Sequence, residues 1–171
     1  MDNSEKKYVI FLDIDGVLVS YLDLMIKDEY GQKFVQEAVD SLNCLISQFN
    51  ADICISSSWR VGKTIERLQE ILDVRGVQCK VVGKTPHNGP RGLEIKQWLE
   101  ENPEYTDYII IDDEMVDIIP YIPWNYKTHI KTNMYRCLDM YDIAVFSREY
   151  WNKLPNYINK TKENYGRKIN G

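Results

Sequence analysis

The chain has 171 residues, a formal net charge of −5, 44% hydrophobic residues and 27% charged residues. This length predicts one domain that can bury a sizeable core, and the composition is that of a globular protein. The acidic balance argues against a protein that coats long nucleic acid, although it is compatible with a local basic pocket that grips one phosphate group.

Neither a membrane span nor disulfide bonding is expected from the sequence. No apolar stretch approaches the ~18 residues that a span needs, and the polar start MDNSEKKY has no apolar signal region. The cysteines at positions 44, 54, 79 and 137 form no CxxC pair, so free thiols in a reducing compartment are the expected state. We therefore expect a cytoplasmic protein with no membrane partner.

Strand-like and helix-like segments alternate along the chain. The first strand is the short β-rich run over residues 8–12, which ends at two aspartates. A helix is predicted over residues 33–49, because its apolar side chains recur at intervals of four, three, four and three residues. The further predicted elements, in chain order, are strand 51–56, helix 63–72, strand 79–83, helix 93–101, strand 107–114, strand 127–131 and helices 139–146 and 148–154.

This alternation predicts an α/β fold with right-handed crossovers, a mostly parallel central sheet and helices on both faces. We expect one domain over residues 1–155 and a polar C-terminal tail over residues 156–171. Sheets of this kind bind their ligands at the carboxyl ends of the strands. Polar clusters follow three of the predicted strands at that edge: Asp13 with Asp15, Ser56 to Ser58, and Asp112 with Asp113.

The pair Asp13 and Asp15 needs a chemical explanation, because carboxylates are costly to desolvate at the end of a buried strand. Asp15-Gly16 between apolar runs is also typical of a hairpin tip, but a hairpin does not account for Asp13, which lies inside the apolar run. Four acidic side chains at one sheet edge would repel each other, and a hard divalent cation relieves that repulsion. Magnesium fits, because it takes one or two carboxylates together with water and substrate phosphate.

Three segments, DIDGVL (13–18), SSSWR (56–60) and IIIDDE (109–114), resemble motifs I, II and IV of the haloacid dehalogenase (HAD) superfamily of phosphotransferases. SSWR together with RGLEIKQWL (91–99) narrows the resemblance to the HAD domains of Swiss Army Knife RNA repair proteins. The resemblance spans about residues 8–145 of the chain. It implies a Rossmann-like HAD fold and a magnesium-dependent phosphatase that acts through an aspartyl-phosphate intermediate.

The resemblance also implies roles for individual residues. Asp13 would be the nucleophile that attacks phosphorus and becomes the aspartyl-phosphate. Asp15 would protonate the leaving oxygen and then deprotonate the water that breaks the intermediate. Ser56 would donate a hydrogen bond to the transferring phosphoryl group, with Ser57 as the alternative.

The metal ligands implied by the resemblance come from two strand ends. Asp112 and Asp113 would hold Mg²⁺ together with Asp13 and the backbone carbonyl of Asp15. We therefore expect all four aspartates at a single metal-dependent site.

The superfamily also places one cation, usually a lysine, on the phosphate. No lysine stands in an unmistakable position, so Arg91, which opens the matching helix, is the first candidate, followed by Lys84 and Lys96. Such a cation stabilises the negative charge that builds up on the equatorial phosphoryl oxygens during transfer. A second departure lies at KTNMYRCLD (131–139), where the family tends to have a glycine near Cys137, and a different local turn is expected there.

SSSWRVGKT (56–64) has an alternative interpretation as a P-loop, because Gly62-Lys63-Thr64 resembles the end of that motif. A P-loop would need glycine at position 57, and Trp59 would crowd a loop that must wrap phosphates with backbone N–H groups. Arg60 either contacts a second substrate phosphate or belongs to a surface ion pair.

The chain between the motifs has room for a flap over residues 18–32 but not for a substantial cap domain. An open site suits a large phosphorylated substrate, such as a nucleic-acid end or a phosphoprotein, and also accepts a nucleotide. Candidate rim contacts are Arg60, Lys63 and the aromatics of YIPWNY (121–126), which either stack a base or pack under a loop. The alternatives are a nucleotide or small-molecule monophosphatase and a catalytically silent HAD-like binding module.

Overall fold

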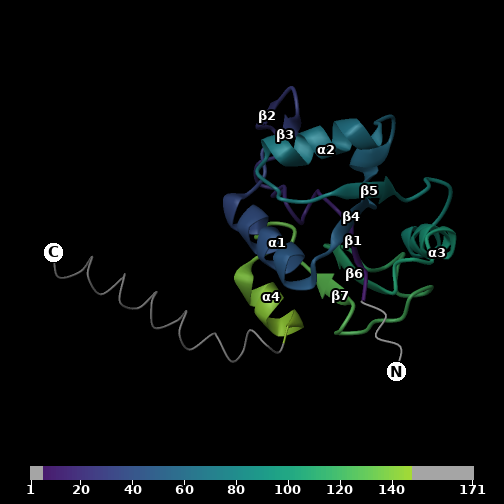
Figure 1. Ribbon diagram of the computed structural model, residues 1–171. Coiled ribbons are helices and arrows are strands. Elements are labelled where there is room, and N and C mark those ends of the chain that lie inside the picture. Colours follow the sequence, from purple (N-terminus) through teal and green to yellow (C-terminus); the bar gives the residue numbers. More distant parts are fainter. Residues whose placement is uncertain (1–5, 148–171) are drawn as a thin grey trace, which may run out of the picture.

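The computed structural model describes residues 6–147 and places five parallel strands in one sheet, in the order β5-β4-β1-β6-β7 (Figure 1). Every neighbouring pair of strands in this sheet is parallel, which confirms the predicted α/β fold. The strands are β1 (Tyr8–Leu12), β4 (Asp52–Ile55), β5 (Val81–Lys84), β6 (Asp107–Asp112) and β7 (His129–Lys131).

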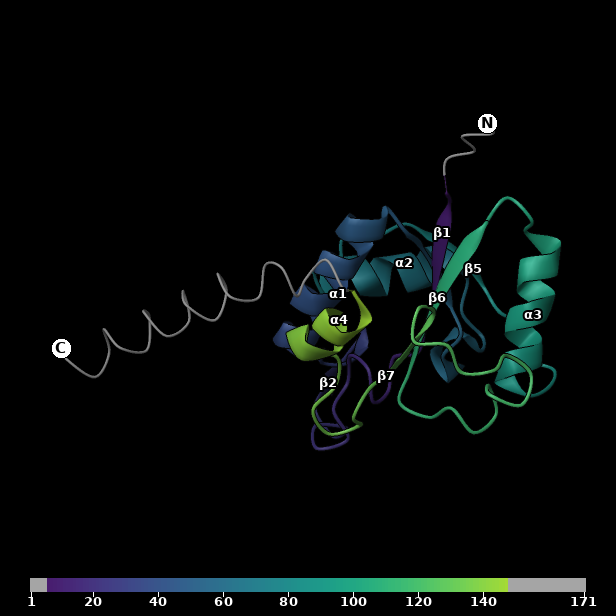
Figure 2. The same cartoon turned by 90° about the horizontal axis from the view of Figure 1, so that it is seen from below.

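Helices cover both faces of the sheet (Figure 2). The helices on one side are α1 (Gln36–Phe49), α2 (Ile65–Val74) and α4 (Met140–Phe146). The opposite side carries α3 (Arg91–Glu101). Within residues 6–147, no helix has the length and apolar character needed to cross a membrane.

The apolar run of β1 is buried on both faces because successive side chains of a strand point to opposite sides. Ile10 and Leu12 pack in the core on the side of α1, α2 and α4. Val9 and Phe11 pack in a second core against α3, where the rings of Phe11 and Trp98 meet edge to face. The central strand therefore ties the two cores together and carries Asp13 at its carboxyl end.

Helix boundaries differ from the predicted ones by one to three residues. α1 begins at Gln36 rather than at residue 33, because Val35 is extended and its N–H donates to the carbonyl of Leu18 at 2.7 Å. β6 ends at Asp112, so Asp113 lies in the turn that follows. The predicted helix over 148–154, the domain end at residue 155 and the tail over 156–171 lie outside the described residues.

The flap, residues 18–32, contains a short antiparallel hairpin that the sequence analysis did not place. Its strands are β2 (Lys27–Asp28) and β3 (Gly31–Gln32). Between residues 6 and 147 no separate cap domain is present, as expected.

The turn at Cys137 keeps a conformation that favours glycine even though the residue is a cysteine. Cys137 has a φ of 66°, and its N–H donates to the carbonyl of Asn133 at 2.7 Å. The chain therefore forms a left-handed turn at this position without a glycine.

Candidate active site

The turn after β1 places Asp13 and Asp15 at the carboxyl edge of the sheet. The N–H of Asp13 donates to the carbonyl of Ile111 at 3.0 Å, which continues the pairing of β1 with β6. A helical turn follows, in which the N–H of Leu18 donates to the carbonyl of Ile14 at 2.8 Å. The hairpin alternative for Asp15-Gly16 is therefore wrong: β1 leads into this turn and has parallel neighbours on both sides.

Gly16 allows this turn to pass against Asp113. Its φ is 78°, and a Cβ at this position would lie 2.4 Å from Cγ of Asp113. A larger residue would displace the carboxyl group or move the turn away from it.

Three aspartates form a buried cluster at this edge. Asp13, Asp112 and Asp113 each offer a carboxylate oxygen, and these oxygens lie within 4.8 Å of one another. Burial raises the pKa of both Asp112 and Asp113, and the charge of Asp13 raises them further. The ionised carboxylates of this cluster therefore need positive charge close to them.

Arg91 supplies part of that charge from the first residue of α3. Its Nη1 lies 3.1 Å from Oδ2 of Asp13 and also pairs with Oδ2 of Asp112. Burial alone would lower the pKa of Arg91, but the two aspartates outweigh it and raise the pKa. The backbone N–H of Arg91 donates to Oδ2 of Asp117 at 3.3 Å, which fixes the start of the helix.

The other two candidate cations do not contact this cluster. The ammonium of Lys84 donates to the carbonyl of Lys63 at 2.6 Å, in the loop after β4. Lys96 lies exposed on α3 and forms no ion pair with any residue between 6 and 147. Of the three candidates, Arg91 is the one that the fold brings to the aspartates.

The aspartate cluster fits a hard divalent cation. Its donor set consists of carboxylate oxygens, the ligands that Mg²⁺ prefers, and one guanidinium does not balance three carboxylates. The side chain of Asp15 turns away and accepts hydrogen bonds from Nε1 of Trp59 at 3.1 Å. Burial raises the pKa of Asp15, and the Trp59 N–H partly offsets that rise.

The serines after β4 differ in their partners. Oγ of Ser56 is buried and has no hydrogen-bond partner among residues 6–147, although the backbone N–H of Ser56 donates to the carbonyl of Leu12 at the end of β1. Oγ of Ser57 accepts the N–H of Trp59 and caps a 3₁₀ turn (Ser58–Arg60). Ser57 is thus the capping residue, and Ser56 presents a buried, unpaired hydroxyl at the carboxyl end of β4, the strand next to β1.

Arg60 has neither of its expected roles. It is 3% exposed, so it is neither a surface residue nor free to meet a second phosphate. Its guanidinium pairs with Oε2 of Glu94 at 2.7 Å and donates to the carbonyls of Ser56, Ser57, Thr85 and Pro86. Arg60 therefore has a structural role: it joins the serine loop (residues 56–60) to the loop after β5 and to α3.

SSSWRVGKT does not form a P-loop. Residues 58–60 form the 3₁₀ turn, and Thr64 caps α2 by accepting the N–H of Arg67 at 3.2 Å. The ammonium of Lys63 donates to the carbonyl of Trp59 at 3.0 Å. This loop therefore presents side chains, where a P-loop would present a row of N–H groups.

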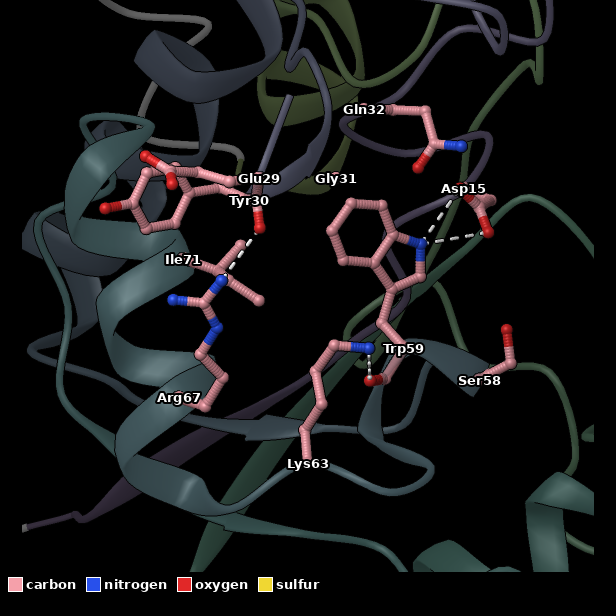
Figure 3. Close-up of a pocket in the computed structure, with 10 residues that line it drawn as sticks. All are labelled: Asp15, Glu29, Tyr30, Gly31, Gln32, Ser58, Trp59, Lys63, Arg67 and Ile71. Carbon is pink, nitrogen blue, oxygen red and sulfur yellow. Dashed lines mark hydrogen bonds between the residues drawn. The ribbon is translucent and has the colours of Figure 1, made fainter. Parts of the chain in front are cut away.

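A pocket of about 330 Å³ opens beside Asp15, between the flap and α2 (Figure 3). Two aromatic residues that line this pocket, Trp59 and Tyr30, were not predicted as site residues from the sequence. Trp59 directly follows the three serines at positions 56–58, and this position in the sequence could have identified it as a site residue. Tyr30 carried no such signal, because the hairpin that presents it consists of two-residue strands.

The aromatics of YIPWNY lie elsewhere. Trp124 and Tyr126 line a second cavity, of about 210 Å³, together with residues of β7 and α4. The rings of Trp124 and His129 are 5.3 Å apart, so Trp124 packs against the last strand of the sheet. Neither side chain lines the pocket beside Asp15.

In a comparison with protein-family models, residues 9–143 match the HAD domain in Swiss Army Knife RNA repair proteins. The matched range contains the aspartate cluster, the serine loop, Arg91 and the pocket. No curated protein and no solved structure matches the chain.

Proposed function

We propose, from the premise that this chain belongs to the family of HAD domains in Swiss Army Knife RNA repair proteins, that it hydrolyses phosphomonoesters at the Asp13 site. The observation that carries the proposal is the convergence of Asp13, Asp15, an unpartnered Ser56 hydroxyl and Arg91 at one sheet edge. These groups provide a nucleophile, an acid, a hydrogen-bond donor and a cation for one phosphoryl group.

In the first step, a carboxylate oxygen of Asp13 attacks phosphorus and the bond from phosphorus to the leaving oxygen breaks. Asp15 gives its proton to that leaving oxygen, and its raised pKa favours the protonated form that this step requires. The product is an acyl-phosphate on Asp13 and a free alcohol.

In the second step, a water molecule attacks phosphorus and the Asp13 carboxylate leaves. Asp15, now a carboxylate, takes the proton of that water and returns to its starting form. Inorganic phosphate is released, and atoms and charges balance over the cycle.

Arg91 and Ser56 would hold the phosphoryl group during both steps. Arg91 has further N–H groups beside the one that meets Asp13 and Asp112, and the Ser56 hydroxyl has no competing partner. Preorganised donors of this kind stabilise the charge that develops in transfer.

Asp13, Asp112, Asp113 and the carbonyl of Asp15 would hold the magnesium ion. When bound, Mg²⁺ supplies positive charge against the phosphoryl oxygens and offsets the repulsion between the aspartates. The fit rests on the oxygen-only donor set and on the closeness of the three carboxylates.

The preferred substrate is a phosphorylated nucleic-acid end, with a free nucleotide or small monophosphate as the alternative. Two observations support the nucleic-acid end: the absence of a cap domain within residues 6–147 and the family's place in RNA repair proteins. Because no cap covers it within these residues, the sheet edge would leave room for a substrate much larger than the phosphate itself.

The test is hydrolysis of p-nitrophenyl phosphate with Mg²⁺ and with EDTA, using wild-type protein and Arg91→Ala. We expect turnover that EDTA abolishes and a loss of about 10²-fold or more in kcat for Arg91→Ala, as for removal of one preorganised donor. Lys96→Ala, on the same helix but away from the aspartates, is the matched control and should retain wild-type kcat. A wild-type protein that binds phosphate but never turns over would instead support the binding-module alternative.

A further inference from the structure

We propose that the pocket between the flap and α2 binds the nucleoside that carries the phosphate, with its base on the indole of Trp59. This inference rests on the proposed phosphatase function and specifies what its leaving group is. The pocket has a volume of about 330 Å³, which is at the small end of the range of about 300–1,000 Å³ typical of ligand sites.

The position of the pocket follows the chemistry of the first step. Asp15 protonates the leaving oxygen, so the leaving group must lie on the Asp15 side of the phosphorus. Asp15 lines this pocket, whereas Asp13, Asp112 and Asp113 do not. A phosphate at Asp13 therefore directs the rest of its molecule toward Trp59 and the flap.

The walls of the pocket suit a flat ring. Figure 3 shows the indole of Trp59 broadside, with Asp15 on one side and Tyr30, Ile71 and Arg67 on the other. Trp59 is only partly buried, and its ring is held in place by Phe34, by Asp15 and by close contact with Gly31. A ring that is fixed in this way, only partly buried and part of the pocket wall, suits stacking with any base, because every base has a flat face.

Two cations border the same space. The ammonium of Lys63 lies 5.9 Å from the centre of the Trp59 ring, and the guanidinium of Arg67 lies 4.8 Å from that of Tyr30. Arg67 also pairs with Glu70 at the surface, where such pairs contribute little and exchange easily. These cations suit the next phosphate of a polynucleotide, which a phosphopeptide does not have.

The flap wall is formed in advance of binding. Arg75, at the end of α2, forms a two-pronged ion pair with Asp28, at 2.7 and 2.9 Å. The same guanidinium donates to the carbonyls of Gly31 and Gln32. The hairpin is thus pinned to α2, so binding does not have to order it.

The experiment measures binding to the Asp13→Asn protein by calorimetry in the presence of Mg²⁺, so that no turnover intervenes. The probes are adenosine 3′- and 5′-monophosphate, glycerol phosphate and a phosphoserine peptide. We expect the better adenosine monophosphate to bind about tenfold or more tightly than glycerol phosphate, as one stacked base provides. This preference should fall toward one in Trp59→Leu, which removes the stacking ring, and in Tyr30→Ala, which removes part of the pocket wall.

Tyr141→Ala and Trp124→Leu are the matched controls, because both residues are outside the pocket, and they should keep the preference. Equal binding of adenosine monophosphates and glycerol phosphate would overturn the inference, as would a preference that survives both pocket variants. A phosphoserine peptide that binds as tightly as the nucleotide would overturn it too. Failure of the phosphatase proposal is seen separately, as absent turnover of p-nitrophenyl phosphate by wild-type protein.

Discussion

Asp13 and Asp15 are two residues apart, yet their carboxylates have different neighbours. Asp13 faces Arg91 and the other buried aspartates, which keeps it beside positive charge. Asp15 faces the indole N–H of Trp59 and the open pocket, and burial raises its pKa. Paired carboxyls in different environments are suited to different roles, here nucleophile and acid.

At the residue scale, Asp15→Asn should separate good from poor leaving groups. Nitrophenolate leaves without much help from a proton, whereas the oxygen of a nucleoside or glycerol needs one. We expect Asp15→Asn to lower kcat/KM for a nucleoside monophosphate by about 10²–10⁴-fold, the contribution of general acid catalysis, and to lower transfer from p-nitrophenyl phosphate much less. A stopped-flow record of the first turnover gives the comparison, and equal losses for both substrates would contradict the acid role.

Gly16 and Gly62 provide a matched pair of residues. Both have positive φ, 78° and 71°, but a Cβ on Gly16 would collide with Asp113 whereas a Cβ on Gly62 meets nothing within 4 Å. Gly62→Ala should cost about 1–2 kcal/mol of unfolding free energy from backbone strain alone. Gly16→Ala should cost more and should also remove Mg²⁺-dependent activity, measured by urea unfolding and phosphate release. Similar effects of the two substitutions would contradict the placement of Asp113 against this turn.

Single residues were predictable where the fold alone places them. Asp13, Asp112 and Asp113 meet because the ends of adjacent parallel strands share an edge, so their positions followed from the strand pattern. Arg60 was not predictable in this way, because its partners at Thr85, Pro86 and Glu94 come from a loop and a helix much later in the chain.

At the scale of elements, the Arg60–Glu94 pair joins the segments that follow β4 and β5 to helix α3. Arg60 follows β4, its carbonyl partners include the loop after β5, and Glu94 lies on α3 one turn after Arg91. Glu94 also accepts the N–H groups of Asn88 and Gly89, which fixes the loop before α3. The pair thereby sets where Arg91 stands relative to the aspartates.

Removal of Glu94 should therefore be costly. Glu94→Ala leaves the Arg60 guanidinium buried without its charge partner, and we expect a loss of about 3–5 kcal/mol in unfolding free energy. Glu70→Ala breaks the exposed Arg67–Glu70 pair and is the control, with an expected cost of about 0–1 kcal/mol. Denaturant unfolding of both variants gives the comparison. A Glu94→Ala protein as stable as Glu70→Ala would show that the Arg60–Glu94 pair contributes little to the free energy of unfolding.

Most elements followed from periodicity, and the flap did not. The apolar residues of α1 recur at helical spacing, and β1 is a continuous apolar run, so the type of each element followed from its sequence. The strands β2 and β3 have two residues each and are not buried, so they leave no pattern to find. Their position depends on Arg75 of α2, a contact across more than forty residues of chain.

At the scale of the whole molecule, the site combines an open edge with a net charge of −5. The overall field repels a polyanion, so recognition of a nucleic-acid end must depend on the local cations Lys63, Arg67 and Arg91. In the proposed reaction, the uncapped edge would also leave the phosphoryl group accessible to water, which would favour hydrolysis over transfer to a second substrate.

The most direct test of the account is to locate the phosphoryl group on the enzyme. Wild-type protein and Asp15→Asn are mixed with Mg²⁺ and p-nitrophenyl phosphate, whose leaving group needs little help from a proton, and are then quenched in acid and digested. The peptides are weighed by mass spectrometry. We predict one added phosphoryl group on the peptide that contains Asp13, accumulating in Asp15→Asn because its second step lacks a base, and absent from Asp13→Asn and from EDTA samples. A phosphoryl group on another residue, or Mg²⁺-dependent turnover that persists in Asp13→Asn, would contradict the central claim that Asp13 is the nucleophile.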